Sequence, residues 1–187
     1  MNIVSIYTES TPNPESMKFV VNRYLLPNDT REYISPETAL ESPLAVALFG
    51  FEYVRSIFIS NNYITILKTA DADWNDLIPE LKVFFKGYLE SGNEIIRLDA
   101  PAANNAHEEN EIIRRIKDIL IDYVQPAVEQ DGGAINFHAF DETSGRLTVK
   151  MQGSCSGCPS SVVTLKQGIE NLMQRMVPQV KEVVAAD

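Results

Sequence analysis

The chain has 187 residues, enough for one large domain or two small ones with buried cores. Its formal net charge of −10 at pH 7 argues against nucleic acid and anionic lipid as main partners, because both select for clustered Lys and Arg. Neither a secretory signal nor an apolar run of membrane-spanning length is visible. Two cysteines in a Cys-x-x-Cys pair, without an export signal, are typical of a reducing compartment. We therefore expect a soluble cytoplasmic protein with no nucleic-acid or membrane partner.

Residues 1–98 begin with patterns typical of β-strands. Alternating or β-branched apolar residues occupy several segments, as expected for strands that bury one face. The predicted strands are Asn2–Ser10, Met17–Asn22, Val54–Ser60 and Tyr63–Thr69. The last two are separated only by Asn61 and Asn62, which predicts a hairpin. The polar segment Asn28–Glu32 is predicted to be a loop.

Helix signals alternate with these strands. Ser35-Pro36 and Ser42-Pro43 each predict a helix start, since serine caps the amino-terminal end and proline fits the first helical position. A longer helix is predicted to begin after Asp73 and to end near Gly92, because its apolar residues recur at three- and four-residue intervals. We expect this unit to be α+β, with antiparallel strands under one long helix.

The composition changes over residues 99–110. This segment has a proline, acidic residues without Lys or Arg, and no apolar period, which together indicate a flexible acidic linker. The chain is therefore predicted to contain two small α+β domains, residues 1–98 and 111–187, joined by that linker.

Residues 111–187 predict the element order α-β-β-α-β. The predicted segments are a helix over Glu111–Val124 whose end is perturbed by Pro126, a turn at Asp131–Gly133, strands Ala134–Phe140 and Arg146–Gln152, a helix that starts at Pro159 and ends before Pro178, and a strand Val180–Val184. The cysteine pair then lies at a strand-to-helix corner.

The segment Gly153–Ser161 holds both cysteines, Cys155 and Cys158. This spacing brings two sulfur atoms close enough to hold one metal ion, to close a small disulfide, or to hold one edge of an iron–sulfur cluster. The predicted helix begins directly after the pair, and its amino-terminal amides and dipole favour the thiolate form that binds metal. Two thiolates are half of a tetrahedral ligand set.

Several interpretations of the pair remain open. Burial as two small apolar side chains is a poor fit to a loop rich in Gly and Ser. A dithiol redox site is the second interpretation, but Ser154 stands where thioredoxin-like sites carry an aromatic residue. A zinc ion within one chain needs two more ligands, and the candidates are His107 in the linker and His138 on the predicted solvent face of a strand.

Symmetry offers another solution. Two copies of the chain that each contribute Cys155 and Cys158 supply four thiolates, the set that a 4Fe–4S cluster takes. A cluster held at an exposed interface can be released, which suits a carrier. No general base or activated nucleophile is apparent, so we expect no enzyme activity and no catalytic residues. The alternatives are a thiol–disulfide oxidoreductase and an interaction module with a structural zinc ion shared between subunits.

Residues 111–187 resemble the NifU-like C-terminal (Nfu) domain of iron–sulfur cluster carriers. The matching segments are Val124–Pro126, Asp131–Gly133, Gly153–Ser161 and Thr164–Glu170. Residues 1–98 resemble the Nfu N-terminal domain of mitochondrial-type Nfu proteins. There the matches are Thr11–Pro14 with Lys18-Phe19, Ser42–Ala45 with Leu48-Phe49, and Tyr63–Thr65, while Phe51–Val54 departs from the usual pattern.

The resemblance implies the assembly of a 4Fe–4S cluster or its transfer to apo-proteins, with Cys155 and Cys158 at the cluster-binding positions. It also implies apo iron–sulfur recipient proteins and an upstream cluster donor as partners, and a homodimer on cluster loading. The N-terminal domain has no candidate ligand. We expect it to dock donors or recipients, the alternative being that it only aids folding or solubility.

Overall fold

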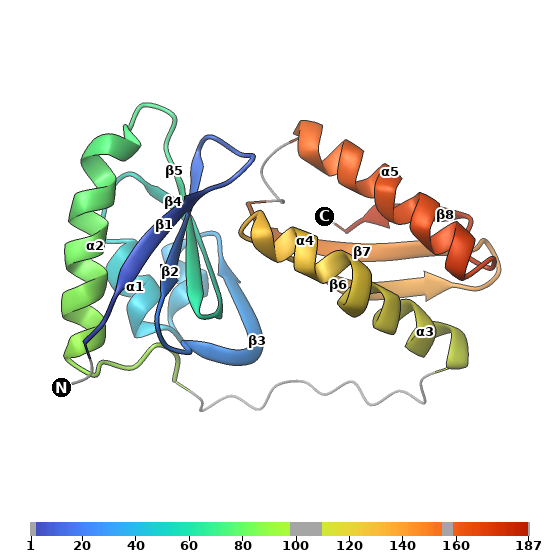
Figure 1. Ribbon diagram of the computed structural model, residues 1–187, viewed down its shortest axis with the longest axis horizontal. Coiled ribbons are helices and arrows are strands. Elements are labelled where there is room, and N and C mark those ends of the chain that lie inside the picture. Colours follow the sequence, from blue (N-terminus) through green and yellow to red (C-terminus); the bar gives the residue numbers. More distant parts are fainter. Residues whose placement is uncertain (1–2, 98–109, 155–158, 187) are drawn as a thin grey trace. The chain divides into compact units, whose positions relative to one another are not determined.

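The computed structural model describes residues 3–97, 110–154 and 159–186, and it separates into two compact units, residues 1–102 and 103–187 (Figure 1). Each unit contains a sheet and helices, so the predicted α+β class is confirmed. Of the predicted linker, only Asn110 is among the described residues, and the linker and the exact domain limits stay predictions. No helix in the described ranges is long and apolar enough to cross a membrane.

The first unit is built on a five-stranded antiparallel sheet with the strand order β1-β2-β5-β4-β3. The strands are β1 (Ile6–Ser10), β2 (Ser16–Val21), β3 (Leu26–Tyr33), β4 (Val54–Asn61) and β5 (Tyr63–Lys68). The predicted hairpin is present, because β4 and β5 pair antiparallel up to the pair Ser60 and Tyr63. Its turn consists of Asn61 and Asn62, as the sequence predicts.

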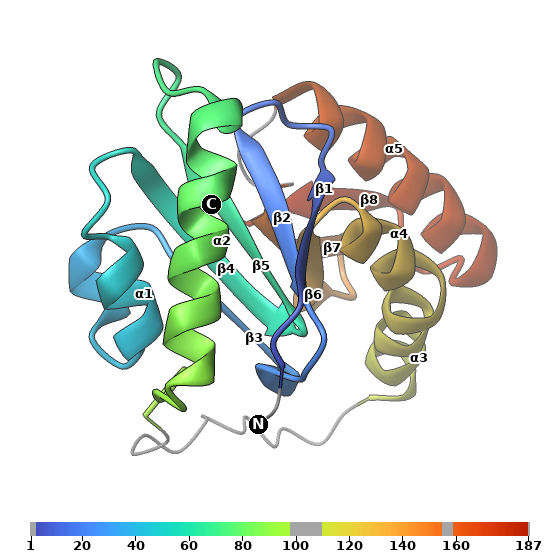
Figure 2. The ribbon, with the colours of Figure 1, turned by 60° about the vertical axis from the view of Figure 1, so that its left-hand side comes forward.

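Helices α1 and α2 cover one face of this sheet (Figure 2). The helical elements are η1 (Pro36–Ala39), α1 (Pro43–Leu48) and α2 (Trp74–Glu90). Alternate strand residues such as Phe19, Ile57 and Ile64 meet Leu81 and Phe85 of α2, and all five are fully buried. Burying one such side chain contributes about 1.5–3 kcal/mol, so this single-faced core accounts for the position of α2.

One prediction for the first unit is wrong: the segment Asn28–Glu32 belongs to strand β3, not to a loop. β3 is an edge strand that pairs only with β4, and the register shifts between Leu26 and Thr30. Pro27 is tolerated there, because an edge position with a bulge does not need its missing amide hydrogen.

The second unit has a three-stranded sheet with the order β6-β7-β8. Its elements are α3 (Glu111–Ile119), η2 (Leu120–Val124, a π-helix), α4 (Gln125–Gln130), β6 (Gly133–Asp141), β7 (Arg146–Gly153), α5 (Pro159–Met176) and β8 (Glu182–Ala185). The helices contribute to one core against one face of the sheet (Figure 1). β6 and β7 are antiparallel, whereas β8 pairs parallel with β7. The predicted order α-β-β-α-β is thus present, with a parallel last strand.

Pro126 does not end the first helix of this unit, which continues as α4 to Gln130. A proline has no amide hydrogen and clashes with the carbonyl group four residues earlier, so a regular α-helix cannot pass through it unchanged. The helix instead widens to a π-turn over η2, where the amide of Gln125 donates to the carbonyl of Leu120. The proline then occupies the first turn of α4, where its missing hydrogen is harmless.

Candidate functional site

The predicted ligands Cys155 and Cys158 lie outside the described residues, so their arrangement stays a prediction. The segment between β7 and α5 that contains Cys155 and Cys158 is called the cysteine loop below, and the residues on both sides of it are described. Strand β7 ends at Gly153, and helix α5 begins at Pro159, directly after Cys158. The amino terminus of α5 therefore follows the second cysteine in the chain, which is the placement that favours a thiolate there.

The first end of the loop is fixed to the turn Asp131–Gly133. The hydroxyl of Ser154 donates a hydrogen bond to the main-chain carbonyl of Asp131. The amide of Ser154 donates to the carbonyl of Gly132 at 3.4 Å, and Gly153 pairs with Gly133 in the β6–β7 ladder. Ser154 is only 3% exposed. The residue before Cys155 is thus buried and bonded through both backbone and side chain.

Two glycines make this junction possible. Gly132 has φ = 77° and Gly153 has φ = 72°, in the left-handed region that residues with a side chain adopt only at a cost. Gly132 ends the turn after α4, and Gly153 is the last residue of β7. These two positions let the chain reverse at the base of the loop.

Helix α4 is held against the start of β6 by a side chain. The amide oxygen of Gln125 accepts a hydrogen bond from the backbone N–H of Ile135 at 3.1 Å, and the amide nitrogen of Gln125 donates to Glu129 at 2.8 Å. On the sheet, Asn136 donates to the side chain of Gln152 at 2.9 Å. The turn Asp131–Gly133, to which Ser154 is hydrogen-bonded, is therefore supported from α4 and from the sheet.

The histidines considered as zinc ligands are not brought to this junction by any described contact. His138 is exposed on β6, where the register shifts between Phe137 and Ala139, and His107 lies outside the described residues. Within residues 3–97, 110–154 and 159–186, no three His, Cys, Asp or Glu side chains gather in a way that could hold a metal ion.

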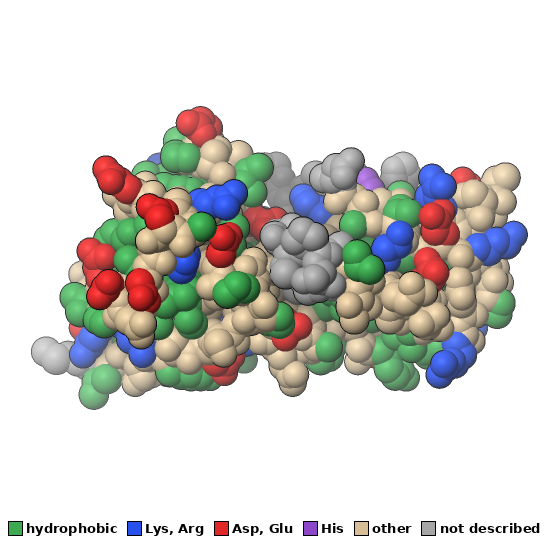
Figure 3. All heavy atoms as spheres, turned by 90° about the horizontal axis from the view of Figure 1, so that it is seen from above, with side chains coloured by type: hydrophobic (Ala, Val, Ile, Leu, Met, Phe, Trp, Pro, Cys, Tyr) green, Lys and Arg blue, Asp and Glu red, His purple; other side chains and the backbone are tan. Residues whose placement is uncertain are grey.

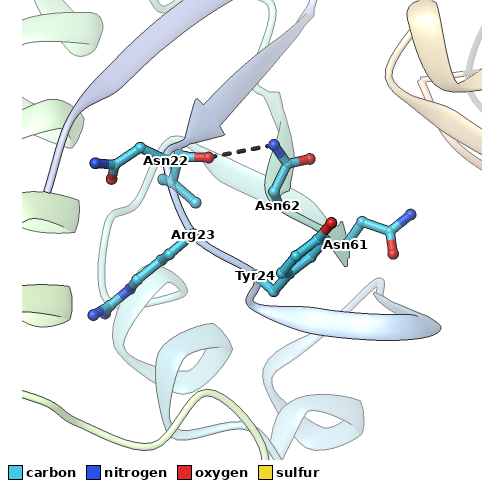
Figure 4. Close-up of a pocket in the computed structure, with 6 residues that line it drawn as sticks. Asn22, Arg23, Tyr24, Asn61 and Asn62 are labelled. Atoms are coloured by element: carbon cyan, nitrogen blue, oxygen red, sulfur yellow. Dashed lines mark hydrogen bonds between the residues drawn. The ribbon is translucent and has the colours of Figure 1, made fainter.

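The first unit has a different kind of surface. An open cavity of about 670 Å³ lies between the β2–β3 connection and the β4–β5 turn (Figure 4). It is lined by Val21, Asn22, Arg23, Tyr24, Asn61 and Asn62. Asn62 donates to the carbonyl of Val21 at 3.3 Å, and Tyr24 is 75% exposed. This lining has no thiol, imidazole or carboxylate, so it suits contact with a protein or peptide better than metal binding.

The first unit is also acidic. Residues 1–97 contain 13 Asp and Glu against eight Lys and Arg. Figure 3 shows Asp and Glu side chains gathered on one face of this unit. A surface of this kind favours partners that present Lys and Arg.

Comparison with known proteins gives the family. The family model "Scaffold protein Nfu/NifU N terminal" matches residues 6–92, and the model "NifU-like domain" matches residues 116–184. The human protein "NFU1 iron-sulfur cluster scaffold homolog, mitochondrial" is 36% identical over 180 residues, which cover 95% of this chain and 70% of that protein. The chain belongs to the Nfu family of iron–sulfur cluster scaffold proteins.

Two further members of the Nfu family match this chain over a similar length. A Drosophila ananassae protein with the same name is 39% identical over 181 residues, covering 95% of this chain and 63% of that protein. "NifU-like protein 4, mitochondrial" of Arabidopsis thaliana is 37% identical over 183 residues, with 95% and 64% covered. The chain thus spans 63–70% of the length of these relatives. The resemblance to the Nfu family that the sequence motifs indicate is confirmed.

The expected cytoplasmic location is contradicted. The relatives described above are named as mitochondrial proteins and not as cytoplasmic ones. The expectation rested on the Cys-x-x-Cys pair and on the absence of a visible export signal. Neither feature distinguishes one reducing compartment from another.

Sequence reasoning identified the segments of the junction but not its contacts. The sequence predicts a turn at Asp131–Gly133 and a perturbed helix end at Pro126, and both motifs carry the family resemblance, but it does not predict which side chains these motifs contact. The structure shows that Gln125 supports β6 and that Asp131 accepts the hydrogen bond of Ser154. The one indication in the sequence is that these motifs occur in the same domain as the cysteine loop, about 20–30 positions before it.

Proposed function

We propose that this Nfu protein binds one 4Fe–4S cluster between two copies of the chain, through Cys155 and Cys158 of each, and transfers it to apo-proteins. The observation that carries the proposal is the number of thiols: each chain has two, and family membership implies an iron–sulfur cargo. A cubane cluster takes four cysteine thiolates, so two chains complete one site.

The described flanks of the loop support this proposal. Helix α5 starts directly after Cys158, and its unpaired amino-terminal amides favour thiolate at neutral pH. In the described ranges no competing group of metal-binding side chains is present. We therefore assign Cys155 and Cys158 as the cluster ligands, and each of the two chains supplies two of the four thiolates.

Transfer is then a ligand exchange. Each recipient cysteine forms an Fe–S bond as an Fe–S bond to Cys155 or Cys158 breaks, and the proton lost by the incoming thiol is balanced by the one that the released thiolate takes up. Such an exchange needs no general base and no nucleophile beyond the thiolates. We accordingly propose a carrier without enzyme activity, loaded by an upstream donor and emptied by apo iron–sulfur recipients.

For the first unit we propose a docking role. Its open polar cavity beside Tyr24 and its excess of carboxylates are surface properties that a partner protein can recognise. If that unit holds a recipient, the second unit reaches the recipient at a raised local concentration. Deletion of the first unit is expected to slow transfer at low recipient concentration and to leave cluster uptake unchanged.

The test replaces each ligand singly. Cys155→Ser and Cys158→Ser should both lose cluster uptake during anaerobic reconstitution with iron and sulfide, while their far-UV circular dichroism stays that of the parent chain. Ser144→Ala, in the exposed β6–β7 turn, is the matched control and should load fully. A full complement of iron and sulfide in Cys155→Ser would refute the ligand assignment.

The same samples distinguish the alternatives. A thiol–disulfide oxidoreductase would stay monomeric and colourless, with a reversible dithiol potential that either serine variant abolishes. A shared structural zinc ion would give a colourless dimer that contains zinc and no sulfide. The proposed carrier gives a brown dimer.

A further inference from the structure

The hydroxyl of Ser154 connects the cysteine loop to the end of a helix. Asp131 is the C-cap of α4, and its amide donates to the carbonyl of Ala127 at 3.3 Å. Carbonyl groups at a helix end have no partner within the helix and must find one elsewhere. The carbonyl of Asp131 finds it in the hydroxyl of Ser154.

The acceptor in this contact is held in place. Helix α4 is bonded to the start of β6 by Gln125 and Ile135, and the turn after it is closed by the amide of Gly132, which donates to Glu129 at 3.1 Å. Ser154 itself is 3% exposed, so water has little access to replace the hydroxyl. The contact is therefore a fixed link and not a solvent-exposed hydrogen bond.

Ser154 directly precedes Cys155, the first proposed ligand. We infer that Ser154 is a positioning residue that anchors the cysteine loop to the carbonyl of Asp131 and thereby slows release of the bound cluster. This inference rests on the proposed function. It concerns how the loop is held, while Cys155 and Cys158 remain the groups that touch iron.

The physical reason is preorganisation. When a thiolate dissociates from iron during exchange, an anchored loop keeps its sulfur close, so that the thiolate rebinds before the recipient replaces it. Without the hydroxyl the loop loses that restraint, and the carbonyl of Asp131 loses the hydrogen bond from Ser154. One hydrogen bond of ordinary strength corresponds to about fivefold in a rate or an equilibrium.

The experiment compares Ser154→Ala, Ser154→Thr and the control Ser144→Ala in the full chain. Each protein is loaded with cluster anaerobically and then mixed with a chelator. The decrease in the visible absorption and circular dichroism of the cluster is followed over time. We expect about fivefold faster loss from Ser154→Ala. Ser154→Thr keeps a hydroxyl and should release the cluster at nearly the parent rate, as should Ser144→Ala.

A second measurement needs no cluster. Hydrogen–deuterium exchange of the metal-free chain is followed in a peptide that contains residues 153–161. Ser154→Ala should exchange about fivefold faster there, and Ser154→Thr should match the parent chain. A parent chain that takes up no cluster, but whose exchange responds in this way, would refute the proposed function and leave the anchor standing.

Equal release rates from the parent chain and Ser154→Ala would overturn the inference. It would also be overturned if Ser154→Thr released as fast as Ser154→Ala, because the hydroxyl would then not be the feature that matters. If Ser154→Ala fails to fold, Ser154→Val decides, since it has the shape of the threonine variant without the hydroxyl and must release the cluster faster than Ser154→Thr.

Discussion

The side-chain oxygen of Gln125 accepts a hydrogen bond from the backbone amide of Ile135 at 3.1 Å. Gln125 is the first residue of α4, and Ile135 is a buried residue of the edge strand β6. An edge strand leaves part of its backbone unpaired, and a side chain that covers such a group removes the cost of burying it. This contact therefore joins the helix and the sheet that support the base of the cysteine loop.

Replacing Gln125 should loosen the second unit. Gln125→Ala leaves the amide of Ile135 without its partner, and we expect a loss of about 1–3 kcal/mol in the free energy of unfolding. Gln130→Ala, at the exposed end of the same helix, is the control and should cost less than about 0.5 kcal/mol. Urea denaturation followed by far-UV circular dichroism measures both. Equal midpoints for the two variants would show that the Gln125 contact contributes nothing.

Two glycines of the second unit should respond to alanine with opposite sign. Gly145 has φ = 72°, and an added Cβ would lie 2.6 Å from the backbone oxygen of Gln179. Gly145→Ala should therefore destabilise this unit by at least about 2 kcal/mol. Gly168 lies in α5 with nothing within 4 Å of an added Cβ, so Gly168→Ala should stabilise by roughly 0.5–1 kcal/mol. Thermal denaturation gives both values, and two shifts in the same direction would contradict the prediction.

Ser42 should matter to the first unit, because its buried hydroxyl has a partner on each side. It donates to the carbonyl of Ile95 at 2.6 Å and accepts from the amide of Ala45 at 3.1 Å, and Ser42 is 0% exposed. Ser42→Ala should cost about 1–3 kcal/mol.

The only tryptophan of the chain, Trp74, lies in α2 and reports on this unit by fluorescence. The control is Ser91→Ala, whose exposed hydroxyl donates to Gly87 at 2.8 Å. A fluorescence transition that moves as much in the control as in Ser42→Ala would argue against a special role for Ser42.

Tyr33 should make the first unit less stable as the pH rises in the alkaline range. Burial raises the pKa of the Tyr33 hydroxyl, and so do its hydrogen bond to Glu41 at 3.0 Å and the charge of that carboxylate. A raised pKa means that the folded state holds its proton more tightly than the unfolded state. The resulting stability is complete below the ordinary tyrosine pKa of about 10 and is lost as pH rises through the folded-state value.

The measurement is the urea midpoint of Trp74 fluorescence at a series of pH values. The parent chain should lose stability above about pH 10. Tyr33→Phe should show a shallower fall, and Glu41→Gln an intermediate one, since it removes the charge but keeps an acceptor. Identical slopes for the parent chain and Tyr33→Phe would contradict the assignment to Tyr33.

The fold class and most elements could be predicted because their signals are local. Asp73 caps α2 through the amide of Asn75, and Gly92 adopts φ = 71° just after it, as the capping pattern predicts. Strand β3 was missed because Pro27 and its polar neighbours favour a loop. Only the pairing of β3 with β4 makes it a strand, and a local pattern does not show that pairing.

Other features depend on contacts distant in sequence. The parallel pairing of β8 with β7 follows from the path of α5, which periodicity alone does not determine. The contact between Ser154 and Asp131 joins residues 23 positions apart, and the sequence gives no direct sign of it. The cysteine spacing predicted the chemistry of the candidate site, whereas the contacts that attach the cysteine loop to Asp131–Gly133 became visible only in the structure.

The central claim is that two chains share one cluster through two cysteines each. The most direct measurement is anaerobic reconstitution followed by size determination and iron and sulfide analysis of the same fraction. The account predicts a brown dimer with about two iron and two sulfide ions per chain, because one 4Fe–4S cluster is shared by two chains. A monomer without iron and sulfide, after reconstitution of fully reduced protein, would contradict it.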